Sequence, residues 1–166
     1  MSLPEGIAIR KARQDEMDAI REMTVKELDM ELDEFEARDK ERIAKAGRAE
    51  AERFLKREGN EFYVAESDGV MAGYLWWGTS QKPFSGTSVG WVYDIQVVPA
   101  YRGRGIGEAL MKHALQVSRE RGLRQTGLMV NEKNRVAWSL YEKLGFRTDH
   151  RLMSRDEPGT VSASNS

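Results

Sequence analysis

The stretch VVPAYRGRGIGEALMKHAL, residues 97–115, decides the fold because glycines and arginines stand between a strand-like run and a helix-like run. Glycine has no Cβ, so its backbone N–H group can approach a ligand closely. The first N–H groups of a helix have no partner inside the helix and carry partial positive charge. The stretch therefore predicts an anion site, most often for a phosphate, where Arg102 and Arg104 add charge-assisted hydrogen bonds. The alternative is a tight turn in which the glycines serve packing and the arginines serve solubility.

Two well-known phosphate loops do not match this stretch. A P-loop ends in Gly-Lys-Ser or Gly-Lys-Thr, whereas Gly107 is followed by Glu108 and Ala109. A dinucleotide-binding fingerprint needs Gly-x-Gly-x-x-Gly, and its third glycine position holds Leu110 or Glu108, depending on the starting glycine. A dinucleotide oxidoreductase is therefore a remote alternative.

Composition restricts the class of protein. The 166 residues suit one globular domain, predicted over residues 1–155, and the small, polar tail 156–166 is predicted to be disordered. The absence of cysteine excludes disulfides, thiolate metal sites and a cysteine nucleophile, and we expect no metal. The net charge of −1 gives no support to a nucleic-acid partner. No apolar run suggests a membrane span or a signal peptide, so the sequence predicts a cytoplasmic protein.

Apolar spacing along the chain predicts a mixed fold. The strands are predicted at residues 6–12, 62–66, 70–78, 91–98, 125–131 and 146–155, and the helices at residues 13–35, 36–59, 106–121 and 134–145. The passage around the glycine loop is expected to join parallel strands with a right-handed crossover. The fold class is thus α/β of the α+β type, with a mostly antiparallel sheet of about six to seven strands and helices on both faces.

At these residues the sequence resembles a family. Residues 102–107, RGRGIG, match the Arg/Gln-x-x-Gly-x-Gly/Ala loop of the GNAT acetyltransferases, the Gcn5-related N-acetyltransferases. The stretch NRVAWSLYEKLGF, residues 134–146, is similar to the C-terminal signature of that family. The resemblance covers about residues 7–155, and it implies a GNAT fold with acetyl-CoA as the pyrophosphate compound.

The resemblance also implies the contacts with acetyl-CoA. In the family, the loop amides hold the pyrophosphate, and the fourth strand pairs with the pantetheine arm where it diverges from the fifth strand. Carried over to this chain, the cofactor-binding residues are Ile95, Val97, Arg102, Gly103, Arg104, Gly105, Ile106, Gly107 and Asn134.

Two residues are candidates for proton transfer. Tyr141 matches the general acid of the family, and a phenol with a pKa of about 10 holds a proton that it can give to a thiolate. The alternative is that Tyr141 belongs to the buried stripe of its helix. Asp94 resembles the acidic position of some small-amine members, where it acts as an electrostatic or water-mediated base. The alternatives are a structural carboxylate and proton removal by ordered water.

The implied reaction moves acetyl directly to a primary amine in a ternary complex, because a cysteine intermediate is impossible. The rival function is an acyl-CoA-binding or sensing module without turnover. The acceptor, a small molecule or a peptide amine, cannot be read from the sequence. The acidic stretch 27–39 favours a cationic acceptor or is an ordinary solvated helix face.

Two further features concern the partner and the core. The resemblance makes a homodimer the expected assembly, with residues 146–155 as a candidate edge strand. Trp76, Trp77 and Trp91 either line an acceptor pocket or fill the faces of the sheet, and alternation favours core packing.

Overall fold

A computed structural model describes residues 3–31, 37–82, 85–151 and 153 of the chain. The chain divides into two compact units, residues 1–131 and residues 132–166, and each is described by itself. One domain over residues 1–155 stays a prediction. The tail 156–166, for which disorder was predicted, lies outside the described residues.

The first unit contains a five-stranded sheet whose strands follow one another in chain order. The strands are β1 (Ile7–Lys11), β2 (Glu61–Ser67), β3 (Val70–Gln81), β4 (Ser88–Val97) and β5 (Thr126–Leu128). The first four pair antiparallel, and β5 lies parallel to β4. The predicted mixed, mostly antiparallel sheet is therefore confirmed.

The expected count of about six to seven strands was wrong. Residues 146–151, part of the predicted final strand 146–155, form no strand. Phe146 is the only apolar residue among FRTDHR, so this segment offers no apolar face that pairing would bury. Residues 152, 154 and 155 of that predicted strand lie outside the described residues.

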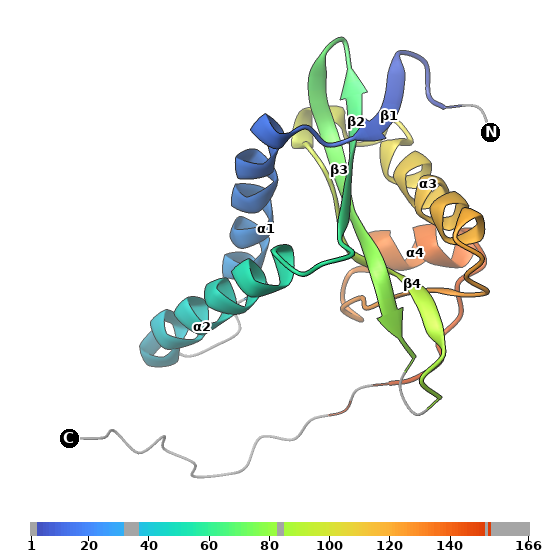
Figure 1. The fold of residues 1–166 in the computed structure, drawn as a ribbon. Coiled ribbons are helices and arrows are strands. Elements are labelled where there is room, and N and C mark those ends of the chain that lie inside the picture. The colour runs from blue at the N-terminus through green and yellow to red at the C-terminus, as the bar shows by residue number, and fades with distance from the viewer. Residues whose placement is uncertain (1–2, 32–36, 83–84, 152, 154–166) are drawn as a thin grey trace. The chain divides into compact units, whose positions relative to one another are not determined.

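Helices cover both faces of the sheet in the first unit, as predicted. The helices of this unit are α1 (Met17–Glu31), α2 (Ala37–Leu55) and α3 (Ile106–Glu120), with short turns η1 (Gln14–Glu16) and η3 (Pro99–Tyr101). Figure 1 shows α1 and α2 on one side of the sheet and α3 on the other. The second unit contains α4 (Arg135–Lys143). Within the described ranges, no helix has the length and apolar character needed to cross a membrane.

Alternation along the strands fills two layers of core. On the α1 side, Ile20 of α1 packs with Tyr74 and Trp76 of β3. On the α3 side, Trp77 donates its indole N–H to Ser118 Oγ at 3.1 Å. Trp76 and Trp77 are 5% and 0% exposed, so core packing is confirmed for both.

A β-bulge in β4 changes which side chains face α1. Trp76 pairs with Asp94 while Trp77 pairs with Val92, so Tyr93 is an extra residue on β4. A bulge turns two successive side chains toward the same face. The Tyr93 ring accordingly lies 5.1 Å from the Trp76 ring, and the Asp94 carboxylate bonds to Tyr74 on that same face.

An ion cluster ties η1 to the strands at the edge of the sheet. Arg10 of β1 lies 2.7 Å from Glu16 and also pairs with Glu66 of β2. The hydrogen bond from Arg10 is the largest cause that lowers the pKa of Glu16, which falls to about 2 from its usual 4.5. Glu16 therefore contributes stability above pH 4.5 that is lost as the pH falls toward 2.

We expect Glu16→Gln to lower the free energy of unfolding at pH 7 by about 2 kcal/mol. The gap between wild type and variant should shrink as the pH falls from 4.5 toward 2, because the wild-type carboxylate then takes up a proton. Urea unfolding at several pH values measures this gap. The matched control is Asp15→Asn, whose side chain is 78% exposed, and a pH-independent gap for Glu16→Gln would contradict the prediction.

Candidate functional site

Beyond its pairing with β5, one edge of β4 is open among the residues that the structure describes. The two strands pair only at Gly90–Val92 with Thr126–Leu128. Past that point, the N–H of Val98 bonds to the Ala72 carbonyl on the β3 side at 2.9 Å. Backbone groups alternate between the two edges of a strand, so those of Ile95 and Val97 face away from β3, toward the open edge. β5 itself ends at Leu128, so the divergence of the two strands stays a prediction.

The glycine loop leads from this open edge into α3. Gly103 and Gly105 have φ angles of +76° and +77°, a region that side chains other than glycine rarely adopt. A Cβ at Gly103 would meet no atom of the described part of the chain within 4 Å, so the loop surface there is open. The first bond inside the helix runs from the Ala109 N–H to the Gly105 carbonyl at 3.0 Å. The N–H groups of residues 106–108 therefore have no partner inside the helix.

The two arginines of the loop are exposed and contact the loop itself. Arg102 donates from Nε to the Val97 carbonyl at 3.2 Å, which joins the loop to the end of β4. The Arg104 guanidinium lies 5.3 Å from the centre of the Tyr101 ring. These contacts fix the loop, and they leave further N–H donors of both side chains for an anion.

Asp94 lies on β4 beneath α1, where three side chains donate to one of its oxygens. Oδ2 accepts from Tyr74 Oη, from Gln96 Nε2 at 3.1 Å and from Thr24 Oγ1 at 3.4 Å. Burial raises the pKa of Asp94 above its usual value, and the hydrogen bond from Tyr74 is the largest opposing influence on that pKa. Part of the residue stays accessible to solvent. Asp94 therefore combines raised basicity with a path to the surface.

The second unit holds the two remaining predicted residues on α4. Asn134 caps the helix, because its Oδ1 accepts the Ala137 N–H at 3.1 Å. The Tyr141 ring lies 5.8 Å from the Phe146 ring, and the Tyr141 carbonyl accepts the Phe146 N–H at 3.0 Å. Asn134 thus has a structural role, capping α4, beside the cofactor contact that the resemblance implies. The roles of Asn134 and Tyr141 toward acetyl-CoA stay predictions.

The sequence pattern did not indicate the hydrogen-bond partners of Asp94. Tyr74 follows the alternation of its strand and reads as a core residue, and Thr24 stands in the apolar stripe of its helix. A polar residue within such a stripe was the available signal, because buried hydroxyls need hydrogen-bond partners. The side chains of the acidic stretch 27–39 lie outside the described part of the chain.

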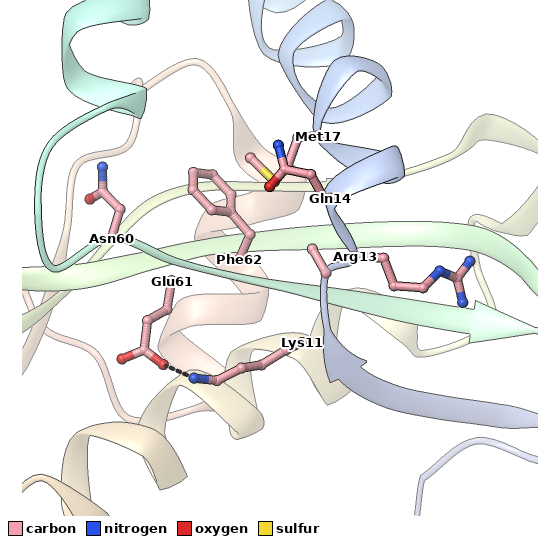
Figure 2. A pocket seen from close by; sticks show the side chains of 8 residues that line it. Lys11, Arg13, Gln14, Met17, Asn60, Glu61 and Phe62 are labelled. Atoms are coloured by element: carbon pink, nitrogen blue, oxygen red, sulfur yellow. Dashed lines mark ion pairs between the residues drawn. The ribbon is translucent and has the colours of Figure 1, made fainter.

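A separate open pocket of about 180 Å³ lies where β1 ends and β2 begins, and no predicted site residue lines it. Figure 2 shows Lys11 and Glu61 paired at its rim, with Lys11 Nζ 3.1 Å from Glu61 Oε2. Arg13, the other cation of the lining, is paired with Glu16 at 3.0 Å. The charged groups around this pocket thus satisfy one another.

Comparison with known proteins identifies the family. A sequence model described as the acetyltransferase (GNAT) family matches residues 18–146 of this chain. This match spans most of the 166 residues and includes β4, the glycine loop and α4. The chain belongs to the GNAT acetyltransferase family, which confirms the resemblance noted in the sequence.

Curated relatives resemble part of the chain. An uncharacterized N-acetyltransferase of Methanocaldococcus jannaschii is 34% identical over 97 residues, which are 55% of this chain and 41% of the relative. A mycothiol acetyltransferase of Amycolatopsis mediterranei is 40% identical over 88 residues, which are 51% of this chain and 29% of the relative. The chain thus matches less than half the length of each of these two relatives.

Solved structures share the fold over nearly the whole chain. A structure from Pyrococcus furiosus has a TM-score of 0.77 at 24% identity, covering 91% of this chain and 99% of that chain. The aminoglycoside N-acetyltransferase AAC(6')-Iy, solved in complex with CoA, has a TM-score of 0.65 at 19% identity, covering 90% and 98%. At these identities the likeness concerns the fold.

Proposed function

We propose that the protein is an N-acetyltransferase that moves an acetyl group from acetyl-CoA to a primary amine by direct transfer in a ternary complex. The observation that carries this proposal is the continuity of the open β4 edge with the glycine loop and the start of α3. Membership of the GNAT family supports the same activity.

The residues present fit acetyl-CoA. A pyrophosphate needs several N–H donors and no side chain in the way, and the loop meets both conditions through its glycines and the free N–H groups of α3. At this edge of β4, the Ile95 carbonyl and the Val97 N–H suit an extended amide chain such as the pantetheine arm, while the Ile95 N–H and the Val97 carbonyl contact Asp94 and Arg102. The residues that would hold acetyl-CoA are Ile95, Val97, Arg102, Gly103, Arg104, Gly105, Ile106, Gly107 and Asn134.

Acetyl-CoA supplies the activated acyl group, and residues of this chain supply the proton transfers and the charge stabilisation. Asp94 takes a proton from the acceptor amine, for which its raised pKa is suited. A backbone N–H on β4 stabilises the charge that develops on the carbonyl oxygen. Tyr141 gives a proton to the leaving sulfur.

Three finer parts of the proposal concern the location of the protein, its assembly and its acceptor amine. We take the protein to be cytoplasmic and homodimeric, although the segment 146–151 offers no edge strand for the dimer. Relatives include enzymes named for mycothiol and for glucosamine 6-phosphate, so small amine acceptors are the first candidates. A cationic acceptor stays a second proposal, since Glu27, Asp29 and Glu31 all belong to the last turns of α1.

A panel of amines tests the function, with release of the free thiol of CoA as the readout. We expect at least one small or peptide amine to release thiol in proportion to enzyme. Acetyl-CoA binding without thiol release from any amine would instead support the sensing module. Thermal stabilisation by NAD and not by acetyl-CoA would contradict both the acetyltransferase and the sensing module.

We expect Gly105→Val to weaken acetyl-CoA binding by tenfold or more, which is about 1.4 kcal/mol. Among the described residues, a Cβ at Gly105 meets only Pro4 Cγ at 3.6 Å, so the effect comes from the left-handed backbone and not from crowding. Calorimetric titration measures the affinity. Gly122→Val is the matched control, because Gly122 has a φ of +70° at the other end of α3. Unchanged affinity in Gly105→Val would remove the loop from the site.

A further inference from the structure

We propose that Tyr74 is a positioning residue for the acetyl transfer, which with Thr24 holds the Asp94 carboxylate by Oδ2 and leaves Oδ1 to accept the proton of the acceptor amine. This inference rests on the proposed function. It adds two residues on β3 and α1 that neither the sequence pattern nor the family resemblance singled out.

The contacts of Asp94 come from three elements, α1, β3 and β4. Tyr74 is fully buried on β3, and Thr24 on α1 is 7% exposed. Their hydroxyl oxygens lie 2.8 Å apart, and both lie within hydrogen-bond distance of Asp94 Oδ2. Gln96 reinforces the arrangement, because its Nε2 lies 3.1 Å from Asp94 Oδ2 and 3.4 Å from the Met23 carbonyl on α1. The three side-chain contacts of the carboxylate therefore all fall on one oxygen, Oδ2.

The hydroxyl groups of Tyr74 and Thr24 keep hydrogen-bond partners in both charge states of Asp94. Each hydroxyl has one proton to donate. When Asp94 is ionised, Tyr74 donates to Oδ2, and Thr24 donates its one proton to Oδ2, to Tyr74 Oη or to the Ile20 carbonyl at 3.0 Å. When Oδ1 takes up a proton, Oδ2 still accepts from Tyr74. No buried hydroxyl loses its partner in either state, so the carboxyl can cycle without a penalty for an unpaired group.

The charge environment suits a base better than a structural carboxylate. Asp94 forms no ion pair with any residue that the structure describes. Its contacts there are neutral: Tyr74, the only titratable one, from β3, Thr24 from α1, and Gln96 with the Ile95 N–H from β4. A neighbouring arginine would lower the pKa of Asp94 and weaken it as a proton acceptor. Hydroxyl donors orient the group at a much smaller cost in basicity.

The proton step balances without another reactant. The N–H bond of the acceptor ammonium breaks, an O–H bond forms at Asp94 Oδ1, and the electron pair stays on nitrogen. The neutral amine then attacks the acetyl carbonyl carbon. Tyr74 and Thr24 exchange no proton with the acceptor, so they act on the reaction only through Asp94.

The test is the pH dependence of kcat/KM in Tyr74→Phe. Removing a donor to the charged form raises the pKa of Asp94, so the acid limb of the profile should move to higher pH by about one unit. Tyr63→Phe is the matched control, because the Tyr63 hydroxyl also donates to a carboxylate, Glu61 at 2.7 Å, on the opposite face of the sheet. Its profile should not move.

Thr24 gives a second pair of variants should Tyr74→Phe fold poorly. Thr24→Val removes the hydroxyl at nearly constant shape and should shift the limb in the same direction by a smaller amount. Thr24→Ser keeps the hydroxyl and should restore the wild-type profile. A shift that Thr24→Ser does not reverse would mean that packing, not hydrogen bonding, is responsible, and would overturn the inference.

A second readout is independent of turnover. Titration of the Asp94 carboxyl carbon by NMR in labelled protein, assigned with Asp94→Asn, should give a higher pKa in Tyr74→Phe than in wild type. An unchanged pKa overturns the positioning role even if the enzyme is active. If the pKa of Asp94 is higher in Tyr74→Phe but the wild-type protein acetylates no amine, the hydrogen bond is real and the proposed function is overturned. The positioning role in acetyl transfer then falls with it.

Discussion

Tyr141→Phe is expected to lower turnover by about 10- to 100-fold while acetyl-CoA affinity stays unchanged. The phenylalanine ring preserves the contact with Phe146, 5.8 Å away, and the hydroxyl group is lost together with its proton. Without that proton the sulfur leaves as a thiolate, which raises the barrier of the second half of the reaction. Steady-state kinetics with an accepted amine gives kcat, and calorimetry gives the acetyl-CoA affinity.

Phe146→Leu is the control that separates chemistry from packing. It disturbs the same ring contact but keeps the Tyr141 hydroxyl. If both variants lose turnover equally, the packing of the second unit is responsible. Wild-type turnover in Tyr141→Phe would leave Tyr141 as a buried residue of α4 and would favour another proton donor.

The loop and its flanking elements were predictable because their signals are local. Gly103 and Gly105 occupy left-handed backbone positions, and a helix begins directly afterwards, so short-range spacing contains the necessary information. The β2–β3 hairpin was predictable for the same reason, with Asp68 and Gly69 at positive φ in its turn. These elements needed no knowledge of distant residues.

The surroundings of Asp94 depend on long-range register and were not predictable. The bulge at Tyr93 arises from the pairing of β4 with β3, and one chain's spacing does not reveal it. Without the bulge, Tyr93 and Asp94 would face opposite sides of the sheet. Thr24 reaches Asp94 across 70 positions of sequence, and Tyr74 reaches it across 20. The segment 146–151 shows the reverse error, since the spacing along the chain predicted a strand that these polar residues do not form.

Asp94→Asn is expected to lower kcat by about 100-fold, because asparagine cannot take the proton of the amine. Asparagine has the same shape, and its carbonyl oxygen can still accept from Tyr74 and Gln96, so the geometry of β4 should persist. The loss should be greatest at low and neutral pH, where the acceptor arrives as an ammonium ion. At high pH a free amine needs no base, and the two enzymes should converge. A constant ratio across the pH range would contradict a base role.

Asp94→Asn should lower activity but should not lower stability. Measuring its stability therefore separates a catalytic base at this position from a structural carboxylate. Burial raises the pKa of the folded carboxyl above its usual 3.8, so the folded state binds more protons than the unfolded state between the two values. Stability therefore falls as the pH rises through that window, and ionised Asp94 destabilises the fold at neutral pH. Asp94→Asn should be at least as stable as wild type at pH 7, with a gap that closes as the pH falls to 3.8. Thermal unfolding across this range measures the gap. A structural carboxylate predicts a less stable variant at pH 7, whereas a base held ready by Tyr74 and Thr24 predicts a variant that has lost activity and kept or gained stability.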